Sequence, residues 1–86
     1  MFYIYAIKSL ASNRIYVGQS ENVIKRLQQH NEGKVRSTSS DRPWILVARQ
    51  SVGSREEARW TEYQLKQSRG KRERWLRRHA INDGLS

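Results

Sequence analysis

Three side chains able to do chemistry gather around one expected strand-to-helix turn, in the stretch RIYVGQSENVIKRLQQH (residues 14–30). Tyr16 precedes the glycine of the turn, and Arg26 and His30 follow it, four residues apart. A phenol can position or deprotonate a water, a guanidinium can neutralise an anion, and an imidazole can pass a proton near neutral pH. These residue types suit an active site, and they equally suit a solvated rim of the protein.

A carboxylate stands on the expected packing face of a later helix. At about 100° per residue, Glu62 shares a face with Ala58 and Leu65, whereas Trp60 and Tyr63 lie on another. Burying a carboxylate without a cation or hydrogen-bond donors costs several kcal/mol. Glu62 therefore needs a partner, either a cationic side chain or a metal ion.

Each candidate also has an ordinary structural explanation. Glu62 can form an ion pair with Arg59 or Lys66 at common helical spacing. Arg26 can extend from the border of an apolar face into water, and a single histidine such as His30 is more often structural than catalytic. Tyrosine is a common strand residue. What favours an active site is that all these side chains occur together.

The composition favours a polyanionic partner. The 86 residues carry 17 Lys and Arg against 8 Asp and Glu, a net charge of +9. A protein so basic binds polyanions by releasing their condensed counterions, and 12 of the 17 cations are arginine, whose planar fork suits phosphate. The chain has no cysteine for disulfides or thiolate metal sites. We expect a soluble, cytoplasmic domain over residues 1–86, without a signal peptide or membrane span.

Three segments have the composition of strands. Residues 2–8 (FYIYAIK) alternate β-forming side chains over two partly covered faces, and residues 14–18 follow them after a run of turn residues. Residues 44–50 (WILVARQ) are rich in apolar and β-branched residues. The first two segments predict a hairpin, which places Tyr5 and Tyr16 on adjacent strands.

The first helix is expected from Ser20, as its N-cap, to about His30, with a left-handed terminus in the NEG that follows. Its helical period places Arg26 and His30 together on one edge of the packed face. The apolar stripe of this face is expected to comprise Val23, Ile24 and Leu27.

Two further helices and a loop complete the expected elements. Ser54 and Glu57 form a capping box for a helix over residues 54–67. Residues 69–80 are dense in arginine and predict a short basic closing helix. The earlier segment KVRSTSSDRP (residues 34–43) is polar, small and contains a proline, so it predicts an exposed basic loop.

The ordered set of motifs resembles the GIY-YIG nuclease domain. The set comprises YIY at residues 3–5, YVG at residues 16–18, then Arg26, His30 and a helical Glu62. The likeness covers nearly the whole compact domain. It is strongest toward the small stand-alone bacterial members, and it includes features of the nuclease domain of structure-specific endonucleases.

The chain departs from the pattern of this family at three points. Tyr3 replaces the glycine of the first tripeptide, and Val17 replaces the isoleucine of the second. Some family members also carry an asparagine after the glutamate, where this chain reads GKRERW, and Asn82 lies further on. These departures bear on catalysis more than on fold.

The resemblance implies an α+β fold, with a small three-stranded antiparallel sheet flanked by helices. It also implies hydrolysis of phosphodiester bonds with one divalent metal ion, Mg²⁺ or Mn²⁺, held by Glu62. A two-metal centre needs several clustered carboxylates, whereas the other acids of this chain fall at expected helix caps and in polar segments. One carboxylate suits one hard ion that keeps most of its waters.

The resemblance also implies a role for each side chain of the set. Tyr5 or Tyr16 acts as general base or positions the water, and Arg26 stabilises the charge of the phosphorane. His30 serves as a proton relay or contacts the phosphate. Because an unperturbed tyrosine has a pKa near ~10, a nearby cation must favour its phenolate, or a metal ion must acidify the water.

Further cations are expected to contact backbone phosphates, which gives affinity without reading the sequence. For the closing helix, the alternative is a solvated basic surface. Lys66 also has a second interpretation, as the ion-pair partner of Glu62. The expected phosphate contacts are Arg36, Arg42, Lys66, Arg69, Lys71, Arg72 and Arg74.

The preferred interpretation is a metal-dependent DNA endonuclease of low sequence specificity, with a preference for branched or damaged DNA as one version of it, in repair or recombination. A protein partner could supply specificity. The second interpretation is a non-catalytic nucleic-acid-binding module that kept the fold. A third is a basic RNA-binding or ribosome-associated protein, although the base-stacking aromatic motif of common RNA-binding modules is absent.

Overall fold

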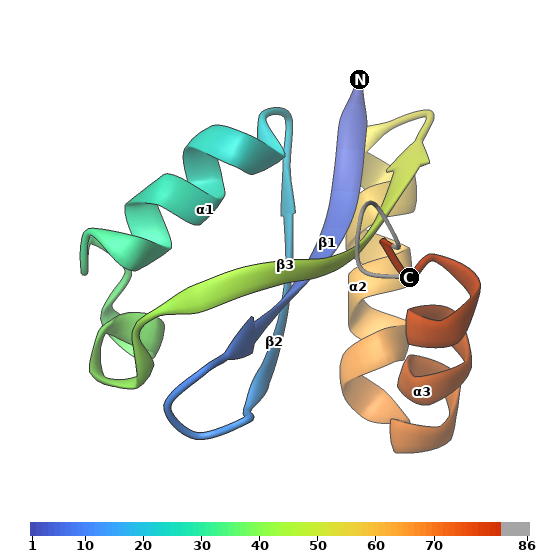
Figure 1. The fold of residues 1–86 in the computed structure, drawn as a ribbon. Helices are drawn as coiled ribbons and strands as arrows, with labels where there is room; N and C mark the ends of the chain where they lie inside the picture. Colours follow the sequence, from blue (N-terminus) through green and yellow to red (C-terminus); the bar gives the residue numbers. More distant parts are fainter. Residues whose placement is uncertain (82–86) are drawn as a thin grey trace.

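The computed structural model describes residues 1–81, and Asn82 and Asp83 lie outside this part. Its centre is a sheet of three antiparallel strands, β1 (Phe2–Ser9), β2 (Ile15–Ser20) and β3 (Trp44–Val52), in the order β2-β1-β3 (Figure 1). The expected α+β architecture, a three-stranded antiparallel sheet flanked by helices, is confirmed.

The hairpin between β1 and β2 is closed by a serine side chain. The hydroxyl of Ser9 accepts hydrogen bonds from the backbone N–H groups of Ala11 and Ser12, at 3.0 and 2.9 Å. Asn13 adopts φ 63°, in the left-handed region that asparagine tolerates. The turn residues identified in the sequence therefore join the two strands that carry the tyrosines.

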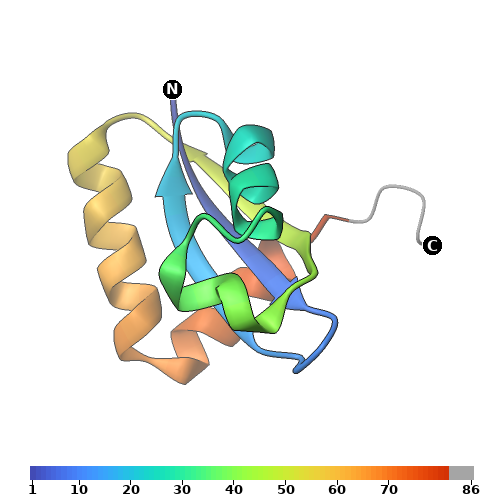
Figure 2. The same cartoon turned by 90° about the vertical axis from the view of Figure 1, so that its left-hand side faces the viewer.

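The helices lie on the two faces of the sheet. On one side are α1 (Val23–Asn31) and the short 3-10 helix η1 (Arg36–Asp41), and on the other are α2 (Arg55–Gln67) and α3 (Arg69–Arg78) (Figures 1 and 2). Figure 2 shows α2 running beside β2, one of the two edge strands of the sheet. Helix α2, although it covers the other face of the sheet, therefore lies next to the strand that carries Tyr16.

Strand register decides which side chains face which layer. Tyr5 lies opposite Gly18, and Ile7 lies opposite Tyr16, and residues directly opposite one another share a face of the sheet. The face with Tyr5 packs under α1, with Ile7, Val23 and Trp44 buried beside it. The tyrosines of β1 and β2 thus meet on one side of the sheet.

The opposite face forms the larger apolar cluster. Ile4 and Ala6 of β1 are fully buried there, and burial of a side chain the size of isoleucine contributes about 2 kcal/mol. Val17, the middle residue of the YVG motif, is buried in this cluster rather than on the face with the tyrosines. The cluster comprises Ile4, Ala6, Val17, Ala48, Val52, Ala58, Leu65 and Trp75.

The cap of α1 differs from the prediction. Asn22, not Ser20, is the N-cap, and its side chain accepts a hydrogen bond from the backbone N–H of Lys25 at 3.0 Å. Ser20 is the last residue of β2, and its hydroxyl accepts from the N–H of Asn22 at 3.0 Å. The strand continues two residues further than expected, which moves the start of the helix.

The predicted stripe of α1 is also partly wrong. Val23 is buried and Leu27 is half-buried, as expected, but the side chain of Ile24 is 64% exposed. The helix ends at Asn31, and Gly33 adopts φ 80°, which suits the expected left-handed terminus. The buried residues of α1 are Val23 and His30. His30 thus belongs to the buried face, and Ile24 does not.

The segment over residues 34–43 is not simply an exposed loop. It contains η1, in which Thr38 is fully buried, while Arg36 and Arg42 lie on the surface. The peptide bond between Arg42 and Pro43 is cis. Long-range contacts hold the segment: the Ser9 hydroxyl donates to the carbonyl of Asp41 at 2.6 Å, and Arg14 forms a 2.7 Å ion pair with the Asp41 carboxylate.

The capping of α2 is close to the prediction. The hydroxyl of Ser54 accepts from the backbone N–H of Glu57 at 3.1 Å, while the Glu57 carboxylate accepts from the N–H of Gly53 at 3.2 Å. Trp60 and Tyr63 lie on the exposed side of α2, as its period predicted. Within residues 1–81, no helix has the length and apolar character that a membrane span requires.

Candidate active site

A buried chain of hydrogen bonds links β1, α1 and η1. Oη of Tyr5 lies 2.8 Å from Nε2 of His30, and Nδ1 of His30 lies 2.8 Å from Oγ1 of Thr38. All three side chains are fully buried. The chain therefore fixes the phenol of Tyr5 through groups from two other elements.

The direction of this chain follows from Thr38. Its hydroxyl donates to the carbonyl of Val35 at 3.2 Å, so its oxygen accepts from His30. The proton of the neutral imidazole is then on Nδ1, and Nε2 accepts from the phenol of Tyr5. Tyr5 is thus held as a hydrogen-bond donor toward the protein interior.

Burial sets the protonation of both rings. It raises the pKa of Tyr5 to about 12, although the nearby Arg26 guanidinium opposes this rise. Burial also lowers the pKa of His30 to about 4, and the charge of Arg26 adds to this effect. At neutral pH the pair is therefore a neutral phenol and a neutral imidazole.

Gly18 provides the space for the Tyr5 ring. A Cβ atom at position 18 would lie 2.8 Å from Oη and 2.9 Å from Cζ of Tyr5, and 3.1 Å from Cε2 of Tyr16. Side-chain atoms are not found at such short separations from a Cβ, so any larger residue would displace a tyrosine. The glycine of the second tripeptide is required by packing against both phenols.

Tyr16 stands next to this chain and is half-buried. Its ring centroid lies 5.0 Å from that of His30 and 6.5 Å from that of Tyr5, in tilted or edge-on arrangements. Nζ of Lys66 lies 5.7 Å from the same ring centroid. Tyr16 is therefore the partly exposed phenol of the cluster, with a cation over its ring.

Arg26 belongs to the same site. Its side chain is half-buried, and Nη1 donates to Oε1 of Gln29 at 3.0 Å. Its charge acts on the pKa of both Tyr5 and His30, so the guanidinium lies near both rings. Arg26 also lines a hollow of about 380 Å³, together with polar residues of β2, α1 and the turn between them, among them Glu21 and Lys25. The guanidinium is thus accessible from solvent.

Glu62 reaches the site from α2 across the edge of β2. Its side chain is 19% exposed. Oε2 accepts a hydrogen bond from Nζ of Lys66 at 2.7 Å, and the two residues form an ion pair one helical turn apart. The carboxylate also contributes to the raised pKa of Tyr5. Of the two ion-pair partners considered, Lys66 is the one that Glu62 uses.

The donor set around Glu62 fits one hard divalent ion that retains several waters. A carboxylate oxygen is a ligand that such an ion accepts, and Lys66 holds Oε2 alone, which leaves Oε1 to bind. Within residues 1–81, no three His, Asp or Glu side chains gather into a denser metal cluster. Glu62 would therefore be the one carboxylate ligand that the described residues offer there, and water would supply the remaining positions of a bound ion.

The predicted phosphate contacts separate into three places. Lys66 is at the site, and Arg36 and Arg42 lie at η1, where Nε of Arg42 donates to the carbonyl of Ser39 at 2.7 Å. The others are on α3, where Arg72 is half-buried and Arg69 pairs with Glu73 at 3.0 Å. Lys71 and Arg74 also lie on α3, where they line a hollow on the other face of the sheet.

Comparison with known proteins assigns the chain to a family. A model described as the GIY-YIG catalytic domain matches residues 1–79. The chain belongs to the GIY-YIG family. Domains of this family are nucleases that act on DNA and generally use divalent metal ions.

Its GIY-YIG relatives include small bacterial proteins. The chain is 32% identical over 83 residues to a UPF0213 protein of Pediococcus pentosaceus, covering 94% of this chain and 86% of that protein. It is 37% identical over 65 residues to a UPF0213 protein of Staphylococcus haemolyticus, covering 74% and 78%. The resemblance to small stand-alone bacterial members is therefore confirmed.

The fold has a solved counterpart among these GIY-YIG relatives. The solution NMR structure of a UPF0213 protein of Bacillus halodurans aligns with a TM-score of 0.53 and 34% identity. The alignment covers 86% of this chain and 81% of that one. Sequence and fold thus give the same assignment.

Two parts of this GIY-YIG site were not found in the sequence. Thr38 lies in a serine-rich run that has the composition of a loop, and only the fold brings it to His30. The sequence predicts Gly18 as the end of a strand and part of the YVG motif, without its contact with Tyr5, which its place opposite Tyr5 in the hairpin could have indicated. Tyr3, which departs from the family pattern, lies near one end of β1. Cζ of Arg49 lies over its ring, 5.9 Å from the centroid.

Proposed function

We propose that this protein is a metal-dependent endonuclease that hydrolyses phosphodiester bonds of DNA with low sequence specificity. The observation that carries the proposal is the buried Tyr5–His30 pair, with Arg26 beside it and Glu62 close enough to act on the pKa of Tyr5. Phosphodiester hydrolysis requires charge neutralisation at the phosphate and a positioned water. The proposed site offers groups for both.

Arg26 is the proposed phosphate-binding cation. A guanidinium matches the oxygens of a phosphate with two parallel hydrogen bonds, and the charge that builds on those oxygens during attack strengthens the interaction. Its bond to Gln29 orients the side chain without neutralising it. Arg26 therefore stabilises the transition state more than the ground state.

The two tyrosines have different proposed roles. Tyr5 has a pKa raised to about 12 by burial and donates into His30, so it is a poor base and serves to orient the site. Tyr16 is half-buried beside the cation of Lys66, which suits a phenol that holds or deprotonates the attacking water. Fully buried His30 acts through Tyr5 rather than on the phosphate itself.

Glu62 is the proposed ligand of one Mg²⁺ or Mn²⁺ ion. When bound, the ion supplies Lewis-acid polarisation of the phosphate and a more acidic water. Lys66 neutralises Glu62 in the absence of the ion and stays available to contact a neighbouring backbone phosphate. Arg36 and Arg42 extend the same proposed contact along η1. Backbone contacts of this kind carry no sequence readout.

The test is cleavage of plasmid and of branched duplexes by the pure protein with Mg²⁺ or Mn²⁺. We expect Glu62→Gln and Arg26→Ala to reduce the rate by about 100-fold or more, because each removes a group that acts in the transition state. Glu56→Gln is the matched control, because Glu56 is an exposed acid on the same helix. Equal rates for Glu62→Gln and Glu56→Gln would contradict the proposal.

The branched duplexes test the finer version of the proposal. Faster cleavage of branched than of linear duplex of the same sequence supports a structure-selective enzyme, as repair or recombination requires. Equal rates support an unselective one. An added protein partner that changes this ratio would account for specificity that the chain does not itself supply.

A second candidate is a nucleic-acid-binding domain without turnover. The observation that favours it is the 2.7 Å ion pair by which Lys66 already satisfies one oxygen of Glu62. It predicts DNA binding that is unchanged by a metal chelator and by Glu62→Gln, with no cleavage under any metal. Metal-dependent cleavage that Glu62→Gln abolishes excludes it.

A further inference from the structure

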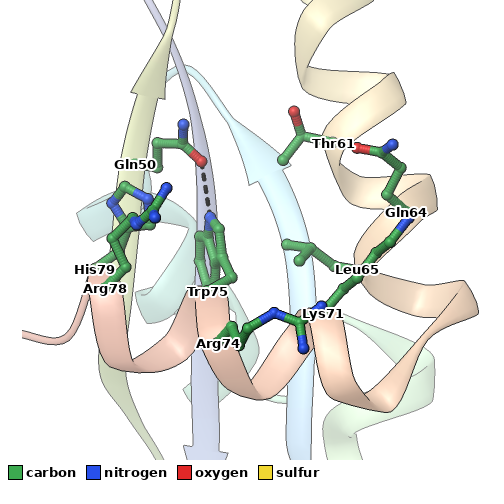
Figure 3. Close-up of a pocket in the computed structure, with 9 residues that line it drawn as sticks. All are labelled: Gln50, Thr61, Gln64, Leu65, Lys71, Arg74, Trp75, Arg78 and His79. Carbon is green, nitrogen blue, oxygen red and sulfur yellow. Dashed lines mark hydrogen bonds between the residues drawn. The ribbon is translucent and has the colours of Figure 1, made fainter.

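A second concave site lies between α2, α3 and β3. It is a hollow of about 270 Å³, which we call the α2–α3 hollow (Figure 3). Leu65 and Trp75 line it, and both belong to the apolar cluster on the sheet face opposite Tyr5. The hollow is therefore separate from the candidate active site.

Three cations line the hollow from one flank of α3. Lys71, Arg74 and Arg78 are spaced by three and four residues, so they are neighbours on the helix surface. Like charges at this spacing repel one another. The ion pairs found within residues 1–81 engage other cations, such as Arg69 with Glu73. The three charges of the hollow thus have no carboxylate partner in the described part of the chain.

The other polar groups of the hollow can also donate hydrogen bonds. Thr61 and Gln64 project from α2, and Gln50 lies across from them on β3, with Trp75 between (Figure 3). Oε1 of Gln50 accepts from Nε1 of Trp75 at 2.7 Å, which orients its amide N–H groups away from the indole. None of the lining residues is acidic. Such a surface suits an anion with several acceptor oxygens.

We propose that the α2–α3 hollow binds a phosphate group. Neighbouring cations with neutral donors around one hollow match a phosphate oxyanion, and the nearly buried Leu65 and Trp75 strengthen the attraction by excluding water from one side. The phosphate comes either from a nucleic-acid backbone or from a free phosphate or nucleotide. The site does not require hydrolysis at the tyrosines.

The experiment follows the indole N–H of Trp75 and the side-chain amides of Gln50 and Gln64 by NMR. The full chain is titrated at constant ionic strength with inorganic phosphate, with a nucleoside monophosphate and with a short DNA duplex. We expect these signals to shift with at least one of the three probes. Shifts with the duplex and weak shifts with phosphate indicate the backbone as the source, whereas shifts with the small probes alone indicate a free ligand.

Matched variants on α3 test the cations. We expect Lys71→Gln/Arg74→Gln to weaken binding of the shifting probe by roughly fivefold or more, because two charges that contact phosphate are lost. Arg77→Gln is the control: Arg77 is an exposed arginine of the same helix that does not line the hollow. No shift with any probe, or equal effects of the double variant and of Arg77→Gln per charge removed, overturns the proposal.

A last variant keeps this proposal distinct from the nuclease proposal. Glu62→Gln leaves the lining of the hollow intact, so the Trp75 shift is expected to persist in it with the same affinity. If the native protein cleaves no DNA but still shows this shift, the nuclease proposal alone is refuted. Cleavage with no shift refutes the hollow alone.

Discussion

At the scale of single residues, the position of Tyr5 depends on the missing side chain at position 18. A Cβ there would lie 2.8 Å from the Tyr5 oxygen, so Gly18→Ala must move the phenol away from His30. We expect a loss of about 1–3 kcal/mol in the free energy of unfolding and of at least about tenfold in DNA cleavage. Urea denaturation and a plasmid assay measure the two effects.

Gly53→Ala is the control for this substitution. A Cβ at position 53 would meet only the Glu57 carboxylate, at 3.5 Å, which is an ordinary contact. We expect little change in either measurement. If Gly18→Ala behaves like Gly53→Ala, the two tyrosines are not held by the glycine.

His30 makes the stability of the fold depend on pH. The pKa of His30 is lowered to about 4 by burial, against an ordinary value of 6.5, so between these values the unfolded chain binds more protons than the folded one. The contribution of neutral His30 to the free energy of unfolding is fully present above about pH 6.5 and is lost as the pH falls toward 4. We expect about 2 kcal/mol of the unfolding free energy to be lost between pH 7 and pH 5.

The other histidine requires a control, because burial and Arg78 also lower the pKa of His79. Urea denaturation at both pH values is compared for the native chain, His79→Gln and His30→Gln. We expect His79→Gln to keep most of the pH dependence and His30→Gln to lose most of it. The opposite ranking would mean that His30 is protonated in the folded state.

At the scale of elements, the sequence fails to predict η1: it predicts an exposed loop where the structure has a 3-10 helix with a buried threonine. Alternation and capping predicted the strands and helices, because those signals are local: Ser54 and Glu57 lie three residues apart. The turn of η1 is held instead by contacts with Ser9, Arg14 and His30, each distant in sequence. A run of serines carries no local signal of those partners, so the sequence predicts a loop and does not identify the buried threonine.

Removal of the Thr38 hydroxyl tests this element. Thr38→Val keeps the shape and leaves Nδ1–H of His30 buried without an acceptor, which costs about 1–3 kcal/mol. Thr38→Ser restores the acceptor and should recover much of that loss, with any remainder due to the missing methyl group. Thermal denaturation compares the variants with the native chain, and equal losses for valine and serine would show that the hydroxyl contributes nothing.

At the scale of the whole molecule, the sequence indicated which side chains come together better than their burial and protonation. Tyr5, Tyr16, Arg26 and His30 were proposed together from their resemblance to the family, and the structure brings their side chains together on one side of the sheet. Complete burial of His30 and the neutral state of Tyr5 depend on how deeply α1 packs on the sheet. That depth is decided by tertiary packing, which periodicity does not record.

With a net charge of +9, the whole surface attracts polyanions, and the proposed DNA binding is expected to involve several of its faces. Arg26 of the candidate site and the arginines at η1 lie on one side of the sheet, and the cations of the α2–α3 hollow lie on the other. Each phosphate neutralised makes the fall of log affinity with log salt steeper by about 0.9. With about four contacts we expect roughly 100-fold weaker duplex binding when salt rises fourfold. Fluorescence anisotropy with two unrelated duplexes of equal length measures this salt dependence.

Because backbone contacts carry no sequence information, both duplexes should give the same slope and affinity. A shallow slope, or affinities that differ tenfold between the duplexes, would mean that base edges rather than phosphates dominate the contact.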